Sequence, residues 1–298
     1  MRIVITGSTG LIGTALVAHL RTNGHETVSL VRRPAASPFE VCWDPASGML
    51  NAKDLEGITA VVHLAGAGIG DKRWSVAYKR KILGSRTKST ELLAQRLAEL
   101  NTKPTVFLSG SAIGIYGPRG DEEIGEDAMP GSTFLADVCE QWERATGPAE
   151  AAGIRTAHLR TGIVLSPNGG ALKKQLPLFK LGLGGKFAKG TQWQSWISIT
   201  DEVRAITHLL TSSLSGPVNL TAPTPVTNTE FTRVLASVVK RPALLPIPSF
   251  GAKLLLGTEL ADALLLTGQR VVPNALMHDG FEFTHPTLDA ALRALIAA

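Results

Sequence analysis

A glycine-rich turn close to the amino terminus constrains the fold of this chain more than any other stretch. Gly7, Gly10 and Gly13 follow the short apolar run 1–5, and the run 11–20 after them places its apolar side chains on one helical face. The order strand, glycine turn, helix is typical of dinucleotide-binding units. Glycine permits the tight turn and lets backbone N–H groups approach a pyrophosphate at the positive end of the helix. The pattern therefore predicts a cofactor site.

The predicted pyrophosphate contacts lie in this turn and in the first turn of the helix that follows it. They are Gly7, Thr9, Gly10, Leu11, Ile12 and Gly13. The alternative is a turn that only lets the helix pack closely against the strand, without a ligand. Because both flanking elements are present, we favour cofactor binding.

Two arginines follow the next predicted strand, 26–31. Enzymes that prefer NAD usually carry a carboxylate at this point, which accepts a hydrogen bond from the ribose 2′-hydroxyl. Arg32 and Arg33 stand here instead, with no acid beside them. A guanidinium group suits a 2′-phosphate, so the pair predicts NADP(H). The alternative that stays open is a solvated basic turn.

The charge pattern argues against a nucleic-acid partner. The chain carries 30 Lys and Arg against 25 Asp and Glu, and its net charge of +5 is spread over 298 residues. Nucleic-acid binders concentrate basic residues in stripes with aromatic residues between them. The densest basic region, 72–88, is interrupted by apolar residues and is typical of a solvated helix face. We expect no nucleic-acid partner.

The cysteines, histidines and apolar runs limit the metal chemistry and the location. Cys42 and Cys139 lie far apart, and none of the seven histidines forms a pair with metal-ligand spacing. We therefore expect reduced thiols and no metal site. No run approaches the roughly 18 apolar residues of a membrane helix, and Gly7 interrupts the first apolar run. We expect a soluble, cytoplasmic protein without a membrane partner.

Predicted strands alternate with predicted helices along the first half of the chain. The strands are 1–5, 26–31, 41–43, 59–64, 105–109 and 155–165, the helices are 11–20, 75–100 and 132–152, and 118–131 is an irregular loop. Helices of this length between strands are typical of parallel crossovers. The predicted fold class is α/β, a Rossmann-type doubly wound parallel sheet with a smaller interleaved C-terminal lobe.

The glycine spacing and the segment 109–117 resemble the extended branch of the short-chain dehydrogenase/reductase superfamily. The resemblance implies that Ser111, close to the end of a strand, is a catalytic residue that helps to hold the reacting oxygen. Extended members also carry Tyr-x-x-x-Lys on the next helix, where the tyrosine moves a proton. This chain has Phe134 and Val138 at those two positions, and neither side chain can donate or accept a proton.

Several longer segments resemble an atypical subgroup of this superfamily, the epimerase family proteins, also named SulA-family sugar epimerases. These segments are 134–143, 160–165, 181–185, 192–197, 220–223, 266–273 and 280–286. The resemblance covers essentially the whole chain. It implies an NAD(P)-binding epimerase-like domain over 1–240, with the Rossmann core mainly in 1–165 and the substrate lobe mainly in 166–240. It also implies a small helical domain over 245–295.

The same resemblance adds cofactor candidates outside the glycine turn. They are Leu64 and Ala65 beside the adenosine ribose and pyrophosphate, Lys81 and Arg86 on a helix, and Val164, whose backbone is expected to meet the nicotinamide amide. For Lys81 and Arg86 the alternative is an ordinary surface charge. The subgroup implies NADP(H) binding, whereas its reaction is generally inferred from sequence.

Four other residues are open to more than one role, and a fifth is expected to cap a helix. Trp193 and Trp196 either line a substrate cleft or pack in the core. Asp137 and Glu140 either supply protons in place of the tyrosine or are solvated on an exposed helix. Asp201 is expected to cap the N-terminus of a helix.

These observations favour an NADP(H)-dependent oxidoreductase or epimerase-like enzyme that acts on a small polar substrate. The alternative is a catalytically quiet NADP(H)-binding sensor or scaffold, because some relatives in the subgroup are linked to cell or organelle division. An ordinary nucleotide-sugar epimerase is disfavoured, since its tyrosine and lysine are missing. We expect a small-molecule substrate, and a homodimer is among the assemblies that we expect.

Overall fold

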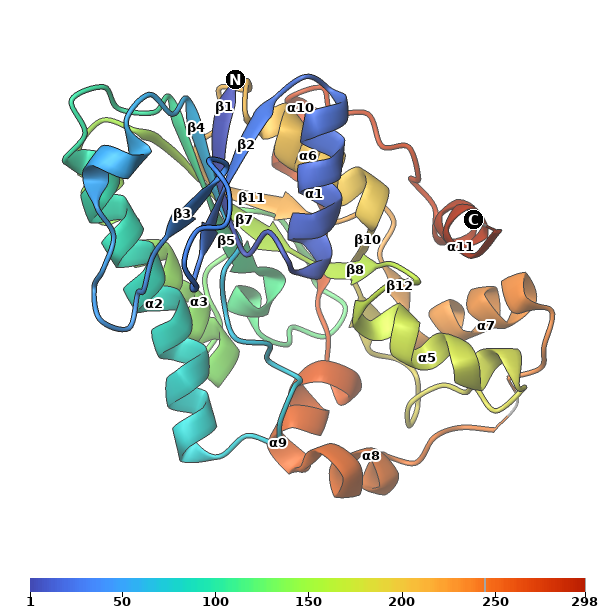
Figure 1. The fold of residues 1–298 in the computed structure, drawn as a ribbon. Coiled ribbons are helices and arrows are strands. Elements are labelled where there is room, and N and C mark those ends of the chain that lie inside the picture. The colour runs from blue at the N-terminus through green and yellow to red at the C-terminus, as the bar shows by residue number, and fades with distance from the viewer. Residues whose placement is uncertain (244, 298) are drawn as a thin grey trace.

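A seven-stranded parallel sheet forms the centre of the computed structural model, which describes residues 1–243 and 245–297 (Figure 1). Across the sheet its strands are β3 (Glu40–Cys42), β2 (Glu26–Val31), β1 (Arg2–Thr6), β4 (Ala60–His63), β5 (Val106–Ala112), β7 (Arg155–Thr161) and β11 (Gly216–Leu220). Each neighbouring pair is parallel. The strand order reverses between β1 and β4, and such sheets bind ligands at the carboxyl ends beside that point. The predicted doubly wound α/β fold is confirmed.

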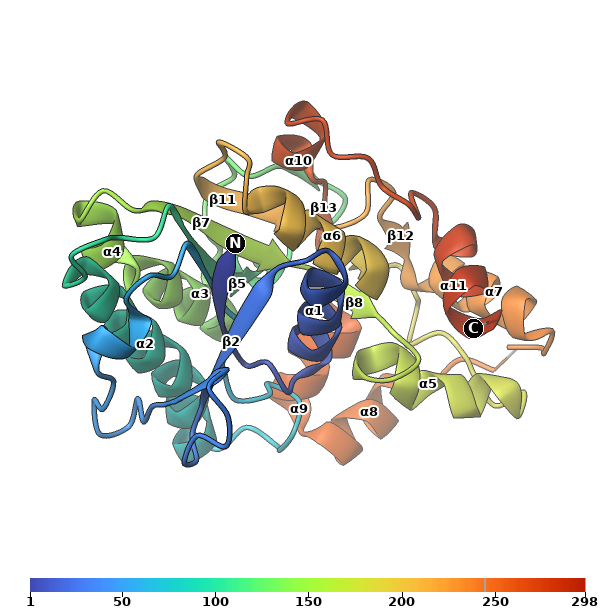
Figure 2. The ribbon, with the colours of Figure 1, turned by 45° about the horizontal axis from the view of Figure 1, so that its top comes forward.

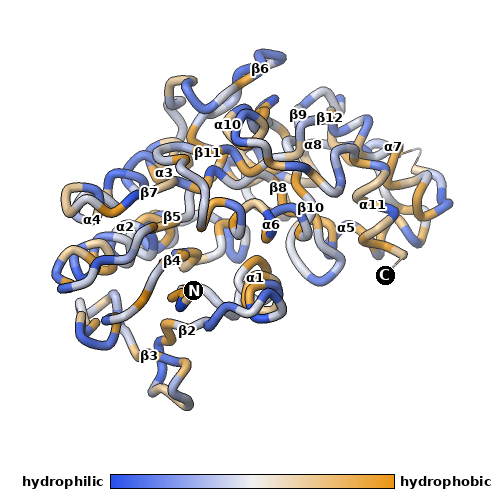
Figure 3. The backbone as a smooth tube through the Cα atoms, turned by 90° about the horizontal axis from the view of Figure 1, so that it is seen from above, coloured by the Kyte–Doolittle hydropathy of each residue, from blue (hydrophilic) through white to orange (hydrophobic). Residues whose placement is uncertain are grey.

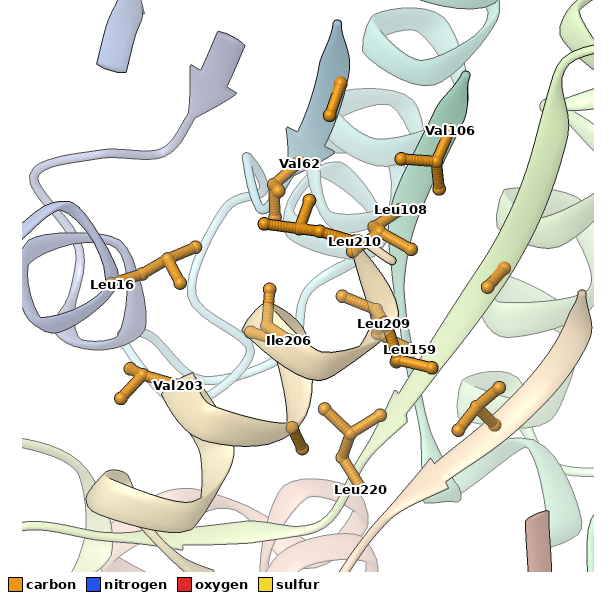
Figure 4. Close-up of a cluster of buried hydrophobic side chains, with 14 of the residues drawn as sticks. Leu16, Val62, Val106, Leu108, Leu159, Val203, Ile206, Leu209, Leu210 and Leu220 are labelled. Carbon is orange, nitrogen blue, oxygen red and sulfur yellow. The ribbon is translucent and has the colours of Figure 1, made fainter. Parts of the chain in front are cut away.

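Helices cover both faces of the sheet because its strands are apolar on both sides. They are α1 (Leu11–Thr22) and α6 (Ile199–Leu209) on one face, and α2 (Val76–Ala98) and α4 (Gly147–Ala151) on the other. On the first face α1 and α6 pack against Val62 and Leu108 (Figure 4). On the second face the helices pack against Val61 and Phe107, the neighbours of those residues in sequence. Figure 3 shows apolar stretches along the central strands and hydrophilic loops around them.

The predicted helix 132–152 is two helices in the structure. α3 (Phe134–Arg144) ends before α4 begins, and Pro148 stands in the first turn of α4. Proline has no backbone N–H and cannot extend the hydrogen bonds of a preceding helix. The prediction of one continuous helix was wrong at this point.

The predicted strand 155–165 also divides. Its first part is β7, and its second part, β8 (Ile163–Leu165), leaves the sheet and pairs with β10 (Trp196–Ser198). Gly162 stands at the break, where an added Cβ atom would lie 2.5 Å from the carbonyl oxygen of Ser195. Only glycine lets these two segments of the chain approach each other this closely.

A second, smaller lobe lies beside the sheet (Figure 2). Its elements are α5 (Gly170–Lys180), β9 (Trp193–Gln194), β12 (Val226–Thr227), α7 (Asn228–Val239) and α11 (Leu288–Ala297). Apolar side chains from these elements, among them Leu172, Phe231 and Leu292, form a core together with Trp196. The smaller lobe that the sequence predicts is therefore present, and α11 joins it from the end of the chain.

The rest of the segment 245–297 contributes short elements to several places. They are α8 (Ser249–Leu256), α9 (Thr258–Ala261), the π-helical turn η3 (Asp262–Leu266), β13 (Arg270–Val271) and α10 (Asn274–His278). Two short 3₁₀ turns, η1 (Ala52–Leu55) and η2 (Ile113–Tyr116), complete the structure. β13 pairs with β6 (Glu123–Ile124), which lies in the loop predicted to be irregular. Among the described residues no helix has the length and apolar character that crossing a membrane requires.

Candidate functional site

The glycine turn between β1 and α1 has a shape that only glycine permits. Gly7 has a φ of +67°, and an added Cβ atom would lie 2.8 Å from the carbonyl carbon and oxygen of Leu64. An added Cβ at Gly13 would lie 2.1 Å from the carbonyl oxygen of Gly7. The helix therefore packs directly on the turn, and the turn packs directly on the end of β4.

The amino end of α1 is open toward the turn. Gly10 is its N-cap residue and supplies no side-chain cap. The N–H groups of Leu11, Ile12 and Gly13 have no hydrogen-bond partner within the described part of the chain. Unpaired N–H groups at the start of a twelve-residue helix form a ready site for an anion. The geometry of the turn thus fits the pyrophosphate of a dinucleotide.

A buried hydrogen-bond network fastens the loop after β4 to the end of β1. The hydroxyl oxygen of Thr6 accepts hydrogen bonds from the backbone N–H groups of Leu64 (3.0 Å) and Ala65 (3.1 Å). The proton of the Thr6 hydroxyl is therefore available for a hydrogen bond to Nδ1 of His63, 2.7 Å away. Nε2 of that histidine lies 3.2 Å from the Ser89 hydroxyl. Complete burial lowers the pKa of His63 to about 3, so the ring is neutral. Neither Thr6 nor His63 was predicted from the sequence as part of the site.

The two arginines after β2 have different surroundings. Arg33 donates from both terminal nitrogens to the Glu40 carboxylate, at 2.8 and 2.6 Å. The hydrogen bonds from Arg33, together with one from the Ala36 N–H, lower the pKa of Glu40 to about 2. Arg32 is exposed and makes no hydrogen bond or salt bridge within residues 1–243 and 245–297. Arg32 is therefore the more available of the two for a phosphate.

Arg86 lies under the loop that follows β4. Its Nη1 donates to the carbonyl oxygens of Ala67 (3.0 Å) and Ile82 (3.1 Å), and its guanidinium lies 5.0 Å from the ring centre of Trp142. Burial lowers the pKa of Arg86. Arg86 thus stabilises the loop after β4 by its hydrogen bond to Ala67. Lys81 is exposed and, among the described residues, has no hydrogen bond or salt bridge.

Val164 lies in β8, close to the first turn of α1. The Leu11 side chain lies against the loop after β8, since an added Cβ at Gly169 would be 2.8 Å from it. Val164 itself packs against the core under α1 and α6. The structure therefore brings Val164, Leu64, Ala65 and the glycine turn to the same edge of the sheet.

Ser111 lies inside β5, which extends to Ala112, three residues beyond the predicted end of the strand. Its side chain is buried and its hydroxyl donates to Glu143 at 2.6 Å. Glu143 in turn accepts two hydrogen bonds of 2.9 Å from Arg160. Burial alone would raise the pKa of Glu143, but the hydrogen bonds and charge of Arg160 lower it overall. The carboxylate is therefore ionised and accepts the hydrogen bond of the Ser111 hydroxyl.

Further hydrogen bonds extend from the buried pair of Glu143 and Arg160. Nη1 of Arg160 donates to the Tyr116 hydroxyl at 2.9 Å, and that hydroxyl donates to Asn219 at 2.7 Å. Asn219 donates to the carbonyl oxygen of Val272 in the C-terminal segment. This chain of polar groups links β5, β7, β11 and the C-terminal segment, and it was not predicted from the sequence.

A cleft of about 240 Å³ opens between α3, η2 and the C-terminal segment. Its lining residues are Trp74, Gly114, Gly117, Pro118, Thr133, Phe134, Leu135, Glu259, Asp262, Ala263, Thr267 and Gln269. Phe134 and Trp74 meet edge to face there, with ring centres 5.1 Å apart. Phe134, which stands where the tyrosine was expected, therefore lines this cleft.

Both tryptophans considered for a substrate cleft lie outside this lining. Trp196 is fully buried in the core of the smaller lobe, and its indole N–H donates to the Thr224 carbonyl oxygen at 3.0 Å. Trp193 is half-buried and its indole N–H donates to Asp121 at 2.7 Å. Of the two readings, core packing describes Trp196.

The helix cap before α6 differs from the prediction. Ser198, rather than Asp201, is the N-cap, and its hydroxyl accepts from the Asp201 N–H at 3.0 Å. The buried Asp201 carboxylate accepts from the N–H groups of Thr284 and His285, both at 2.8 Å. Serine reaches the N–H three residues ahead, so the aspartate is free to hold the C-terminal segment.

Three further carboxylates lie away from the cleft. Asp137 accepts from Gln141 at 2.9 Å on the exposed side of α3, and Glu140 pairs with Arg144. Glu202 is fully buried; one oxygen accepts from the Thr161 hydroxyl at 3.0 Å and the other has no partner. Burial raises the pKa of Glu202 to about 8, so this carboxyl is protonated near neutral pH. Within the described residues no group of three or more His, Cys, Asp or Glu side chains is placed to hold a metal ion.

Comparison with known families covers nearly the whole chain. Residues 3–221 match the model of the NAD dependent epimerase/dehydratase family, and residues 247–295 match a domain of unknown function, DUF1731. An epimerase family protein of Mycobacterium leprae is 44% identical over 97% of this chain and 94% of its own length. The human epimerase family protein SDR39U1 is 34% identical over the full length of both chains.

Two solved structures are similar to this one over its whole length. The crystal structure of human SDR39U1 with NADPH has a TM-score of 0.91 at 33% identity, and the match covers 100% of this chain and 99% of that chain. A nucleoside-diphosphate sugar epimerase from Corynebacterium glutamicum has a TM-score of 0.81 at 39% identity, over 99% of this chain and 58% of that chain.

Proposed function

Because this chain belongs to the NAD dependent epimerase/dehydratase family, we propose that it binds NADP(H) at the glycine turn and transfers hydride to and from a small molecule. The observation that carries the proposal is the open amino end of α1. Gly7 and Gly13 shape the turn by contacts that a larger residue would break, and the first N–H groups of the helix are unpaired in the described chain. A pyrophosphate satisfies those groups.

The remaining cofactor contacts follow from the same edge of the sheet. Arg32 takes the 2′-phosphate, because its guanidinium makes no hydrogen bond or salt bridge among the described residues and acts on Asp44 only through its charge. Leu64 and Ala65, held by Thr6, lie beside the ribose and pyrophosphate. Val164 offers backbone groups to the nicotinamide amide. The NADPH in the human relative's crystal structure supports the choice of cofactor.

When bound, the nicotinamide ring supplies the hydride chemistry, and this chain supplies placement and proton transfer. The expected tyrosine is replaced by Phe134, so the proton travels by another group. We assign it to Ser111, which lies at the carboxyl end of β5 and donates a hydrogen bond to the ionised Glu143. When a substrate hydroxyl is oxidised, its proton would pass to the Ser111 oxygen as the Ser111 proton passes to Glu143, and the same path would run in reverse on reduction. Arg160 holds that carboxylate in place with two hydrogen bonds. The substrate occupies the cleft that Phe134 lines. Gly114, which also lines this cleft, follows Ser111 by three residues along the chain.

The test follows the hydride itself. The protein is incubated with NADPH deuterated at the transferable position and with fractionated cytosolic metabolites, and mass spectrometry reads deuterium in the metabolites. An epimerase cycle shows no net oxidation, so isotope transfer is a better readout than absorbance. We expect deuterium in at least one fraction with the parent protein and none with Gly10→Val. A parent that binds NADPH and transfers no deuterium to any fraction would contradict the proposed reaction.

A further inference from the structure

The cleft at Phe134 has mostly apolar walls. Trp74 and Phe134 form one side with their edge-to-face rings, and Leu135 and Ala263 add aliphatic surface. Hydroxyl and amide groups from Thr133, Thr267 and Gln269 are the uncharged polar part of the lining. Apolar walls with a few polar groups are typical of sites for uncharged ring compounds.

The charges around the cleft are already paired. Glu259 and Asp262 are its two carboxylates; Glu259 is paired with Lys79, and Asp262 with Lys253 at 3.0 Å. Lys79 also lies over the Phe134 ring, 4.8 Å from its centre. Within the described part of the chain no lysine or arginine is among the lining residues. A cationic ligand would have to displace a lysine, and an anionic ligand would have to compete with Glu259 and Asp262 for the lysines that they already hold.

A nucleoside diphosphate sugar suits this cleft poorly. Its diphosphate carries two negative charges, and enzymes bind such groups with guanidinium or ammonium partners or with helix amino ends. The two lysines at this cleft are held by carboxylates. The amino end of α3 borders it, but the Thr133 hydroxyl caps that end by accepting from the Ala136 N–H at 3.2 Å. A diphosphate would have to compete for each of these groups, and burying its charges without a free partner is unfavourable. We propose that the substrate of this site is an uncharged molecule with an apolar or aromatic ring, not a nucleoside diphosphate sugar. The inference rests on the proposed function, because it takes this cleft as the substrate site.

The test uses the uncharged fluorescent probe N-phenyl-1-naphthylamine and UDP-glucose, on the full chain loaded with NADP⁺. We expect the probe to bind, and UDP-glucose at about 1 mM to displace less than roughly a tenth of it. Ala263→Trp fills the cleft and should weaken probe binding at least about tenfold. Leu254→Trp, at an exposed position on α8 outside the lining, is the matched control and should change it less than about twofold.

A second variant guards against misfolding in the first. Ala263→Lys adds a cation to the lining and should weaken the probe while it strengthens UDP-glucose binding; NADP⁺ affinity reports that the fold is intact. Displacement of the probe by UDP-glucose in the parent, or a parent that binds UDP-glucose and not the probe, overturns the inference. Equal effects of Ala263→Trp and Leu254→Trp also overturn it. A parent that does not bind NADP⁺ would instead refute the proposed function, and the probe and UDP-glucose titrations repeated without NADP⁺ would then still test the inference about the cleft.

Discussion

The surroundings of the two arginines after β2 predict that they contribute unequally to cofactor preference. Arg33 already donates two hydrogen bonds to Glu40, whereas Arg32 has no hydrogen bond or salt bridge in the described structure. Arg32→Ala should therefore remove most of the preference for NADPH. A hydrogen bond between charged groups contributes about 1.5–3 kcal/mol, so NADPH should bind roughly 10- to 150-fold more weakly, with little change for NADH.

Arg33→Ala is the matched comparison and should weaken NADPH less than about threefold, because its guanidinium is held by a carboxylate. The pKa of Glu40 is lowered to about 2 by the Arg33 hydrogen bond and the Ala36 N–H, so the pair stays ionised at every pH above that value. The inequality between the two arginines should thus be the same at about pH 7.5 and pH 9, where the 2′-phosphate, with a second pKa of about 6, is also fully ionised. Calorimetric titration with NADPH and NADH measures it. Equal losses in the two variants, or an Arg32→Ala loss shared by NADH, would refute the reasoning.

Three other changes have expected outcomes. Gly13→Ala should lower the free energy of unfolding by about 1–3 kcal/mol, because the added Cβ would lie 2.1 Å from the Gly7 oxygen; urea unfolding measures it, and an unchanged midpoint would show that the turn relaxes without cost. Ser111→Ala should lower isotope transfer roughly 10²–10⁴-fold, and Phe134→Leu far less, because a phenyl ring moves no proton; the reverse order would mean that the proton path is elsewhere. Glu202 has a raised pKa of about 8, so the stability it contributes is complete below pH about 4.5 and is lost as pH rises through 8. Glu202→Gln should flatten that dependence in urea unfolding at pH 5 and pH 8, and a variant with the parent's slope would assign the slope to another group.

Local rules were enough to predict the sheet and the glycine turn. The strand β2 matches the predicted range 26–31, and α1 begins at Leu11 as the pattern indicates. Apolar runs and glycines act over a few residues, so the sequence displays them directly. The break at Gly162 was missed because glycine has no side chain to signal it, and its cause, the Ser195 carbonyl, lies 33 residues away.

The polar part of the site depends on contacts between residues far apart in the chain. Thr6 and His63 meet across 57 positions, and the Tyr116 hydroxyl reaches Asn219 across 103. No spacing rule connects such pairs before the strands are aligned. For the same reason the sequence could not tell that Glu40 holds Arg33, since their pairing depends on β3 lying beside β2.

Calorimetric titration of Gly10→Val with NADPH tests the central claim most directly. Gly10 has an extended φ of −76° that valine can adopt, and its added Cβ would meet only the Gly7 oxygen, at 3.2 Å. The fold should therefore persist while the valine side chain fills the place of the pyrophosphate. Gly84→Val, where an added Cβ meets nothing within 4 Å, is the matched control. We expect the parent and Gly84→Val to bind NADPH alike and folded Gly10→Val to bind neither NADPH nor NADH. Parent affinity in Gly10→Val would place the cofactor elsewhere and contradict the account.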